Sequence, residues 1–427
     1  MEPDRLHIFK AMRSSVRGSD KHLLVGIDVA KSKHHAFFGT ANGRTLRKLL
    51  VFDNSIKGFE SLRSLARDLQ YQHGLVETVY GVEPTACYHK PLAEYLIRQN
   101  EQVVYVSNVA VKKNRALLDG RWDKNDKKDA ANVADLVGQG RCLYYDVPEE
   151  NLQKLRSLIR FRFKLKKQEH AVWMRLRNNI FAQYFPELEG LYIRAGVPDD
   201  QVLAIAEHCL DPGEIAKLEF PDFLKLISRK KIGTKKERHL RELWEAARGS
   251  AGCPVHDEAR WESQSLVHEL KAIQMIVNEC EQRIEKVAQQ FPEYECLLSI
   301  PGFGPIVSAM VLGAIGDPWR FDHQKQLLRL AGLDLCASRS GKKSNSATPE
   351  ISKQGKAALR YALTQASTSA STSNPAVRGY YSRLLKGREL ERGIRLKMKV
   401  KLAAKLLVIA WTLMKRREQF KPSCFPN

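Results

Sequence analysis

Four carboxylates in the first third of the chain have types and spacing that suit metal binding. Asp28 and Glu83 each end a short apolar run, and Asp126 and Asp129 stand three residues apart at the start of a predicted helix. Hard cations such as Mg²⁺ or Mn²⁺ prefer oxygen ligands, and phosphodiester chemistry commonly uses one or two of them to orient the reacting phosphate. Taken singly, each acid is more often a helix cap or a surface charge. As a set they predict a divalent metal site.

The elements that must position these acids alternate between strands and helices. Runs of aliphatic and aromatic residues predict three strands, which short turns join into an antiparallel meander: Leu23–Val29, His34–Thr40 and Leu46–Phe52. The elements expected next are a helix after the cap-like cluster 53–55, a strand ending at Glu83, a helix Tyr88–Arg98, a strand Gln102–Ser107 and a helix capped by Asn125. This order is typical of an RNase H-like domain. If the strands that end at Asp28 and Glu83 pair, the two acids lie side by side, and helical spacing puts Asp126 and Asp129 on one face.

The net charge indicates the kind of partner. The 427 residues include 70 Lys and Arg against 48 Asp and Glu, a formal charge of +22, while the apolar and aromatic fractions are ordinary for a globular protein. The excess is therefore not a sign of disorder. Nucleic acid is the expected partner, because counterion release from its phosphates rewards such a charge. A solvated basic surface and an anionic membrane surface are the alternatives.

Cysteine usage and hydropathy indicate the compartment. Eight cysteines occur with no C-x-x-C pair and no Cys/His pair at zinc-finger spacing, so reduced packing thiols are expected. The N-terminal residues lack a signal-peptide pattern, and no apolar run reaches the ~18 residues of a membrane span. We expect a cytoplasmic protein, associated with the nucleoid, with no membrane partner.

A basic helical region begins at Pro148. Apolar residues recur at helical spacing among many cations from Leu152 to Tyr184, and the amphipathic pattern resumes over Trp261–Gln289. These two helices are expected to pair antiparallel as a coiled-coil stalk, with the uninformative residues 190–260 between them. The cations expected to face nucleic acid are Arg156, Arg160, Arg162 and Lys164. A solvated charged face is the alternative.

Two loops of the C-terminal part combine small residues with features that suit phosphate. The turn 301–304 precedes a helix of small residues, so backbone N–H groups near Gly302 and Gly304 could face a phosphate, as in helix-hairpin-helix modules. A tight turn without a ligand is the alternative. The loop 336–343 could contact phosphate or present a serine nucleophile. Cations expected to contact nucleic acid here are Arg339, Lys342, Lys343, Lys353 and Arg360, followed by the basic segment 386–427.

Taken together, these motifs resemble the DEDD insertion-sequence transposases, a family of bridge-RNA-guided DNA recombinases. The resemblance covers Leu23–Val137 and Leu297–Ser369 and is weaker over the stalk. The matching residues are Gly26-Ile27-Asp28-Val29-Ala30-Lys31, Glu83-Pro84-Thr85, Asn125-Asp126-Lys127-Lys128-Asp129-Ala130, Pro301-Gly302-Phe303-Gly304, Ala331-Gly332-Leu333, Ser340-Gly341 and Ser352-Lys353-Gln354-Gly355. Ala86 departs from the pattern, because the family usually has glycine there.

The resemblance implies an α/β plus all-α fold with an RNase H/RuvC-like domain, a long coiled-coil insertion and a helical transposase domain. On this chain we expect a basic arm over 1–20, the RuvC-like domain over 21–147, the helical stalk over 148–290, the transposase domain over 291–385 and a basic helical tail over 386–427.

The resemblance also implies a chemistry. The family's four acids fall on Asp28, Glu83, Asp126 and Asp129 and would bind the divalent metal, and its serine nucleophile falls on Ser340. In that family the serine forms a covalent phosphoserine with DNA, which conserves the phosphodiester energy for rejoining. The implied partners are the DNA of the element ends and the target, a structured guide RNA and further copies of the chain in a dimer or tetramer. Lys31, Lys127 and Lys128 are expected beside the phosphate.

Two other functions remain open at this point. One is a metal-dependent RuvC-like nuclease or Holliday-junction resolvase without a covalent intermediate, in which Ser340 only contacts phosphate. The other is a non-catalytic nucleic-acid-binding protein derived from a transposase. Ser338 is a rival nucleophile, and Ser352 a weaker one.

Overall fold

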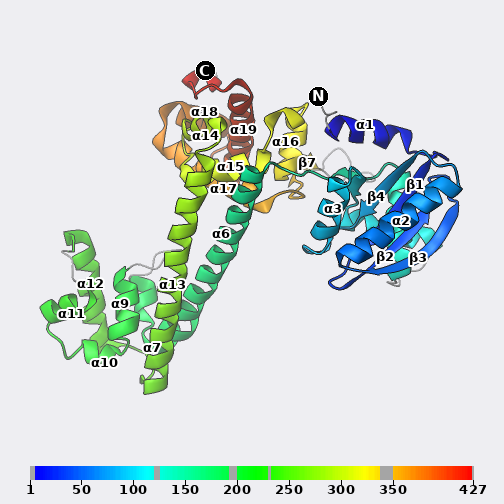
Figure 1. Cartoon of the computed structure of the whole chain (residues 1–427). Helices are drawn as coiled ribbons and strands as arrows, with labels where there is room; N and C mark the ends of the chain where they lie inside the picture. The colour runs from blue at the N-terminus through cyan, green and yellow to red at the C-terminus, as the bar shows by residue number, and fades with distance from the viewer. Residues whose placement is uncertain (1–4, 120–125, 192–199, 229–231, 337–349, 426–427) are drawn as a thin grey trace, which may run out of the picture. The chain divides into compact units, whose positions relative to one another are not determined.

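The chain divides into two compact units, residues 1–147 (unit 1) and 148–427 (unit 2). The computed structural model describes residues 5–119, 126–191, 200–228, 232–336 and 350–425 (Figure 1). The expected fold class is confirmed in its coarse form, because unit 1 is a mixed α/β unit and unit 2 is almost entirely helical.

Unit 1 is built on a six-stranded mixed sheet with the strand order β3-β2-β1-β4-β5-β6. The strands are β1 His22–Asp28, β2 Lys33–Gly39, β3 Thr45–Asp53, β4 Glu77–Val82, β5 Gln102–Tyr105 and β6 Leu143–Tyr144. The first three form the expected antiparallel meander, while β4 runs parallel to β1 and β5 parallel to β4. This arrangement fits a RuvC-like fold.

Helices cover both faces of the sheet because β1 is apolar on both sides. The helices are α1 Arg5–Ser15, α2 Ile56–Gln72, α3 His89–Arg98, α4 Asn108–Asp119 and α5 Asp126–Gly138. Side chains alternate along a strand, so Leu23 and Val25 pack in one cluster with residues of α2 and α3, and Leu24 packs in a second cluster with residues of α1 and α5.

The prediction of a loose basic arm at the N-terminus is wrong for the described part of 1–20. Residues 5–15 form α1, and Met12 and Val16 are buried in the same cluster as the apolar side of α5. The Arg13 Nε donates to the Gly140 carbonyl oxygen at 2.9 Å. The apolar positions of this segment therefore decide its placement, and its cations remain on the outer side.

Unit 2 contains two long helices, α6 Glu150–Arg175 and α13 Asp257–Ala288, which run side by side (Figure 1). Their facing residues, such as Leu165 and Leu270, are buried in one core. This confirms the expected pairing, while supercoiling remains a prediction. A π-helical turn, Leu176–Phe181, continues α6. The helices between the two are α7 Ala182–Tyr184, α8 Glu187–Leu191, α9 Asp200–His208, α10 Pro212–Ile215, α11 Phe220–Ile227 and α12 Thr234–Ala246.

The remaining helices of unit 2 follow α13 and share its hydrophobic core. They are α14 Pro292–Leu298, α15 Pro305–Ile315, α16 Gln324–Ala331, α17 Ala357–Ser373, α18 Pro375–Leu385 and α19 Ile394–Arg416. A short antiparallel pair is formed by β7 Leu335–Cys336 and β8 Glu350–Ile351, and residues 337–349 between them lie outside the described residues.

The basic helical tail expected over 386–427 does contain a helix, α19, and this helix is part of the core of unit 2. It packs against α17 and α14, and Leu402, Leu406 and Ala410 are fully buried. Its cations occupy the opposite face, as amphipathic spacing requires. None of the helices in the described ranges is long and apolar enough to cross a membrane.

Candidate active site

Asp28 and Glu83 meet at one edge of the sheet because their strands pair. β1 and β4 are parallel neighbours with Ile27 opposite Val82, and the Glu83 N–H donates to the Ile27 carbonyl oxygen at 3.4 Å. Asp28 is the last residue of β1, and Glu83 directly follows β4. Both acids are half-buried. The expectation that strand pairing brings them side by side is therefore confirmed.

Asp129 reaches the same edge from α5. This helix lies so close to β1 that a Cβ built at Gly26 would come within 2.1 Å of the Ala130 carbonyl oxygen. A side chain at position 26 would push the helix away, so this glycine sets the distance between helix and sheet. Asp129 is only 1% exposed as a result. Asp126 begins the same helix, but its side chain lies outside the described residues.

Asp28, Glu83 and Asp129 line one cavity of about 260 Å³. The other lining residues are Thr85, Asn108, Lys112 and Arg115. Three carboxylates far apart in the sequence therefore converge on one space, in which two cations from α4 also take part. Sequence reasoning missed these cations because it assigned no helix to residues 108–119, although Lys112, Lys113 and Arg115 were visible there as a basic cluster.

Arg115 forms an ion pair with Asp129 inside this cavity. The Arg115 Nη2 lies 2.6 Å from Asp129 Oδ1, and Nε donates to the same oxygen at 2.8 Å. The two side chains are 17% and 2% exposed. Because both are largely removed from water, the pair is better shielded from salt than a surface ion pair.

A buried amide network holds α4 against α5 and so holds Arg115 in place. Asn114 Nδ2 donates to Asn132 Oδ1 at 2.8 Å and to Asp135 Oδ2 at 2.7 Å, and Asn132 Nδ2 donates to the Val111 carbonyl oxygen at 2.7 Å. Asn114 and Asn132 are 4% and 1% exposed. A satisfied buried network of this kind favours one arrangement of the two helices.

The chemistry of the donors fits a hard divalent cation. The three carboxylates, the Thr85 hydroxyl and the Asn108 amide are all oxygen ligands, which Mg²⁺ and Mn²⁺ prefer. In the described part of the chain, however, no three His, Cys, Asp or Glu side chains are already arranged to hold a metal ion. Arg115 neutralises Asp129 instead. These residues fit Mg²⁺ or Mn²⁺ once the Arg115 guanidinium no longer binds the Asp129 carboxylate.

The loop after Glu83 contains a residue with a strained backbone. Ala86 has φ = 47°, in the left-handed region that an alanine rarely adopts. The loop leads into His89, which is 4% exposed and whose Nε2 lies 3.0 Å from the Tyr105 hydroxyl. Burial lowers the pKa of His89. This histidine packs against aromatic rings and lines no part of the carboxylate cavity.

Several cations expected to contact nucleic acid are bound within the protein. Arg156 Nε donates to the Gly313 carbonyl oxygen at 2.7 Å, Arg162 pairs with Glu281 at 2.6 Å, and Arg360 Nη1 donates to the Ala331 carbonyl oxygen at 2.9 Å. In contrast, Lys31, Arg160, Lys164 and Lys353 are exposed, and Lys128 is half-buried. A role in binding nucleic acid stays a prediction for all of them.

The turn at Gly302 has a packing reason for its glycine. Gly302 has φ = 83°, and a Cβ there would lie 2.3 Å from the Ala366 carbonyl oxygen of α17, whereas a Cβ at Gly304 would meet nothing within 4 Å. Phosphate binding by this turn stays a prediction. Other residues expected to take part in the chemistry lie outside the described residues: Ser338, Arg339, Ser340, Lys342, Lys343 and the side chain of Lys127.

Two family profiles match this chain. One, described as a transposase of the DEDD IS110 type, matches residues 25–186, and the other, described as the transposase IS116/IS110/IS902 family, matches residues 294–382. The first includes the three acids of the carboxylate cavity, and the second includes the turn at Gly302 and the loop that contains Ser340. Together the two matches cover more than half of the chain.

Three relatives from insertion elements of Streptomyces are similar over most of their length. The uncharacterised 44.8 kDa protein of IS116 from Streptomyces clavuligerus is 23% identical over 75% of this chain and 78% of its own. The IS117 mini-circle protein of Streptomyces coelicolor, provisionally named a transposase, is 24% identical over 74% and 77%. The uncharacterised 43.6 kDa protein of IS110 from the same organism is 24% identical over 85% and 88%.

Proposed function

Because the chain belongs to the IS110/IS116 family of transposases and is therefore an enzyme of DNA transposition, we propose that it cuts and rejoins DNA at specific sites through a phosphoserine intermediate on Ser340. The observation that supports this most is the convergence of Asp28, Glu83 and Asp129 on one cavity. Arg115 pairs with Asp129 in this cavity, and three carboxylates that line one space repel one another less when a divalent cation lies among them.

The carboxylates are proposed to hold a divalent metal, as membership of a DEDD-type family implies. Asp28, Glu83 and Asp129, together with Asp126, would be the ligands, and Mg²⁺ is the ion that we propose. When bound, it would neutralise and orient the reacting phosphate. Lys112 is exposed at the same cavity and can bind a phosphate oxygen from the solvent side.

The proposed covalent step conserves bonds. The Ser340 hydroxyl oxygen forms a bond to the DNA phosphorus, one P–O bond to a deoxyribose breaks, and the deoxyribose oxygen leaves as a hydroxyl that takes up the proton lost by serine. Attack by a deoxyribose hydroxyl of another strand end reverses these events and frees the serine. The number of phosphodiester bonds is the same before and after, so rejoining needs no ATP.

We further propose that a structured RNA guides the protein and that several copies act together as a dimer or tetramer. The net charge of +22 is compatible with RNA as well as DNA, because both are polyanions. If base pairing with RNA selects the DNA sites, the protein needs backbone-binding cations more than base-reading side chains. Cleavage of paired strands at the same time requires one serine for each strand.

The test is detection of protein covalently joined to labelled DNA on a denaturing gel. The full chain is incubated with the ends of its element, co-purified RNA and Mg²⁺, alongside Ser340→Ala, Ser338→Ala and Asp28→Asn. We expect an adduct in the unsubstituted protein and in Ser338→Ala, and none in Ser340→Ala or Asp28→Asn.

Other outcomes would replace the proposal. Loss of the adduct only in Ser338→Ala would move the nucleophile to that residue. Cleaved DNA without any adduct, unchanged by Ser340→Ala, would indicate a metal-dependent nuclease of the RuvC type. DNA and RNA binding with neither cleavage nor adduct would indicate a binding protein.

A further inference from the structure

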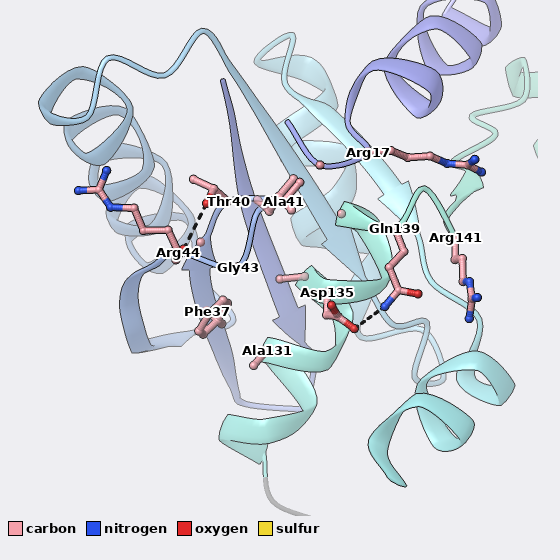
Figure 2. Close-up of a pocket in the computed structure, with 15 residues that line it drawn as sticks. Arg17, Phe37, Thr40, Ala41, Gly43, Arg44, Ala131, Asp135, Gln139 and Arg141 are labelled. Carbon is pink, nitrogen blue, oxygen red and sulfur yellow. Dashed lines mark hydrogen bonds between the residues drawn. The ribbon is translucent and has the colours of Figure 1, made fainter. Parts of the chain in front are cut away.

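A second and larger pocket in unit 1 lies between β2 and α5, away from the carboxylate cavity (Figure 2). Its volume is about 680 Å³. Much of its lining consists of small or apolar residues, namely Leu24, Gly39, Ala41, Ala134 and Gly138. A space of this size with small residues on its walls can admit a flat ring system.

An aromatic ring forms part of one wall. Phe37 of β2 is half-buried, and it lines the pocket together with Ala131 of α5, whose side chain is a single methyl group (Figure 2). Any base has a π-face that can stack on such a ring, so stacking binds nucleobases without demanding a particular sequence. The pair of Phe37 and Ala131 therefore defines a slot for one ring.

Three arginines flank the pocket. Figure 2 shows Arg44 on one side and Arg17 and Arg141 on the other, with their side chains extending outward. All three are exposed, and within the described part of unit 1 none forms an ion pair with a carboxylate. The Arg44 guanidinium lies 3.4 Å from His73 Nδ1. Cations on both sides of an apolar slot suit a polymer whose phosphates continue past the bound ring.

A carboxylate supplies a polar group in the pocket. Asp135 accepts hydrogen bonds at Oδ2 from Asn114 and from Gln139, each at 2.7 Å. Its Oδ1 accepts no hydrogen bond from the described residues. This oxygen would repel a phosphate but can accept a hydrogen bond from the amino group of a base.

We propose that this pocket binds one unstacked base of a single-stranded nucleic acid, with the neighbouring phosphates on Arg17, Arg44 and Arg141. A paired base in a duplex has both faces stacked and cannot enter a slot of this kind. Asp129 and Asp135 are six residues apart on α5, about 9 Å along the helix axis. A strand anchored at the pocket would therefore pass close to the carboxylate cavity. The proposal rests on the proposed function only in assuming that the protein handles nucleic acid.

The test is photo-crosslinking of the full chain to short single strands of about twelve nucleotides. One strand is DNA and one is RNA, each with 5-iodouracil in the middle, and the crosslinked residue is identified by mass spectrometry. We expect a crosslink at Phe37. Ala131→Trp, which fills the slot, should lower its yield by about tenfold or more, in line with the loss of one stacked base. Ala131→Ser, which leaves the slot open, should preserve it.

A second set of variants removes charge without touching the slot. Arg17→Ala with Arg141→Ala should weaken the crosslink and reduce its dependence on salt, because two phosphate contacts are lost. Arg98→Ala, which removes an exposed arginine of α3 that pairs with Glu94 and does not line the pocket, should have no such effect. Thermal unfolding of each variant shows whether it is folded.

Two results would overturn the proposal: crosslinks that map away from Phe37 although the strands bind, or a Phe37 crosslink that survives Ala131→Trp in a folded protein. The DNA and RNA arms show which strand occupies the pocket. The crosslink requires neither Ser340 nor Mg²⁺, so its absence leaves the serine adduct unaffected, and failure of the adduct leaves the crosslink unaffected.

Discussion

Arg115→Met is expected to destabilise unit 1 and, at the same time, to strengthen its binding of Mg²⁺. In the unsubstituted protein the guanidinium binds Asp129 Oδ1 through both Nη2 and Nε. A metal ion that uses this carboxylate must first displace the guanidinium. Methionine keeps much of the side-chain length but leaves the nearly buried Asp129 without its cation, so the variant should be less stable when no metal is present.

The size of the effect follows from the burial of the pair. Removing one partner of a buried ion pair costs about 3–5 kcal/mol, and the 17% exposure of Arg115 reduces this to about 2–3 kcal/mol. For a unit of this size, that loss lowers the melting temperature by about 5–10 °C. Mg²⁺ at about one hundred times its Kd would restore about 2.7 kcal/mol. Relief from competition with the guanidinium should tighten Mg²⁺ binding by about tenfold.

Thermal unfolding in chelator and in Mg²⁺, together with calorimetric titration of Mg²⁺, measures both quantities without DNA. Arg63→Met is the control, because Arg63 and Glu101 form a pair of similar length in the same unit, at 2.7 Å with side chains 18% and 16% exposed. Glu101 also lies 3.8 Å from a second arginine, Arg67. Neither Arg63 nor Glu101 lines the carboxylate cavity. The control should lose less stability, because Glu101 is more exposed than Asp129 and keeps Arg67 nearby, and Mg²⁺ should not restore that loss.

The competition argument fails if Arg115→Met binds Mg²⁺ no more tightly than the unsubstituted protein and stays equally destabilised in chelator and in Mg²⁺. Arg115 would then be a structural partner of Asp129, and the metal would bind without that carboxylate.

Two further predictions concern stability. Gly302→Ala should destabilise unit 2 by about 2–4 kcal/mol with or without DNA, because a left-handed backbone and contact with the Ala366 carbonyl oxygen both oppose a Cβ. The control Gly304→Ala should change the melting temperature little. Equal effects of the two substitutions on the melting temperature would contradict the packing explanation. The second prediction concerns His34, which is fully buried. Its Nδ1 accepts a hydrogen bond from the Ala30 N–H at 3.2 Å, and burial lowers its pKa. The unfolded state therefore binds the extra proton, so stability present above about pH 6.5 is lost as the pH falls through the folded pKa. His34→Asn, which keeps an acceptor near the place of Nδ1, should flatten the fall in unfolding free energy between about pH 7.5 and pH 5, and a slope equal to that of the unsubstituted protein would refute this.

The position of Asp28 beside Glu83 could be predicted because it depends on local patterns. Each acid follows an apolar run that reads as a strand, and parallel neighbours bring their carboxyl ends to one edge of the sheet. The close approach of α5 was also present in the sequence as Gly26, although only the structure shows that this glycine contacts the Ala130 backbone.

Charge alone does not show which partner a cation takes within the protein. Arg156, Arg162 and Arg360 read as nucleic-acid contacts, yet their guanidinium groups bind Gly313, Glu281 and Ala331 within the protein. The partner of a long side chain is chosen by tertiary packing, often across more than one hundred residues. Charge counts cannot identify it.

In α19 the charges of the sequence also concealed a structural role, because the helix belongs to the core. Ile394, Met398, Leu402 and Leu406 recur at the spacing of a buried helix face, a pattern that the surrounding cations obscured. In an amphipathic helix the apolar face decides the placement, because burial of apolar surface contributes more than solvated charges oppose.

By itself, the sequence determined the α/β class of unit 1, the helical class of unit 2, the strand ends that carry Asp28 and Glu83, and the membership of a transposase family. Only the tertiary structure decided that α4 contributes Lys112 and Arg115 to the carboxylate cavity, that Arg115 neutralises Asp129 and that Phe37 and Ala131 line one pocket. The physical reason is the distance along the chain over which each kind of interaction acts. Period and propensity act over a few neighbouring residues, whereas a cavity is formed by side chains that meet only after sheet and helices have packed.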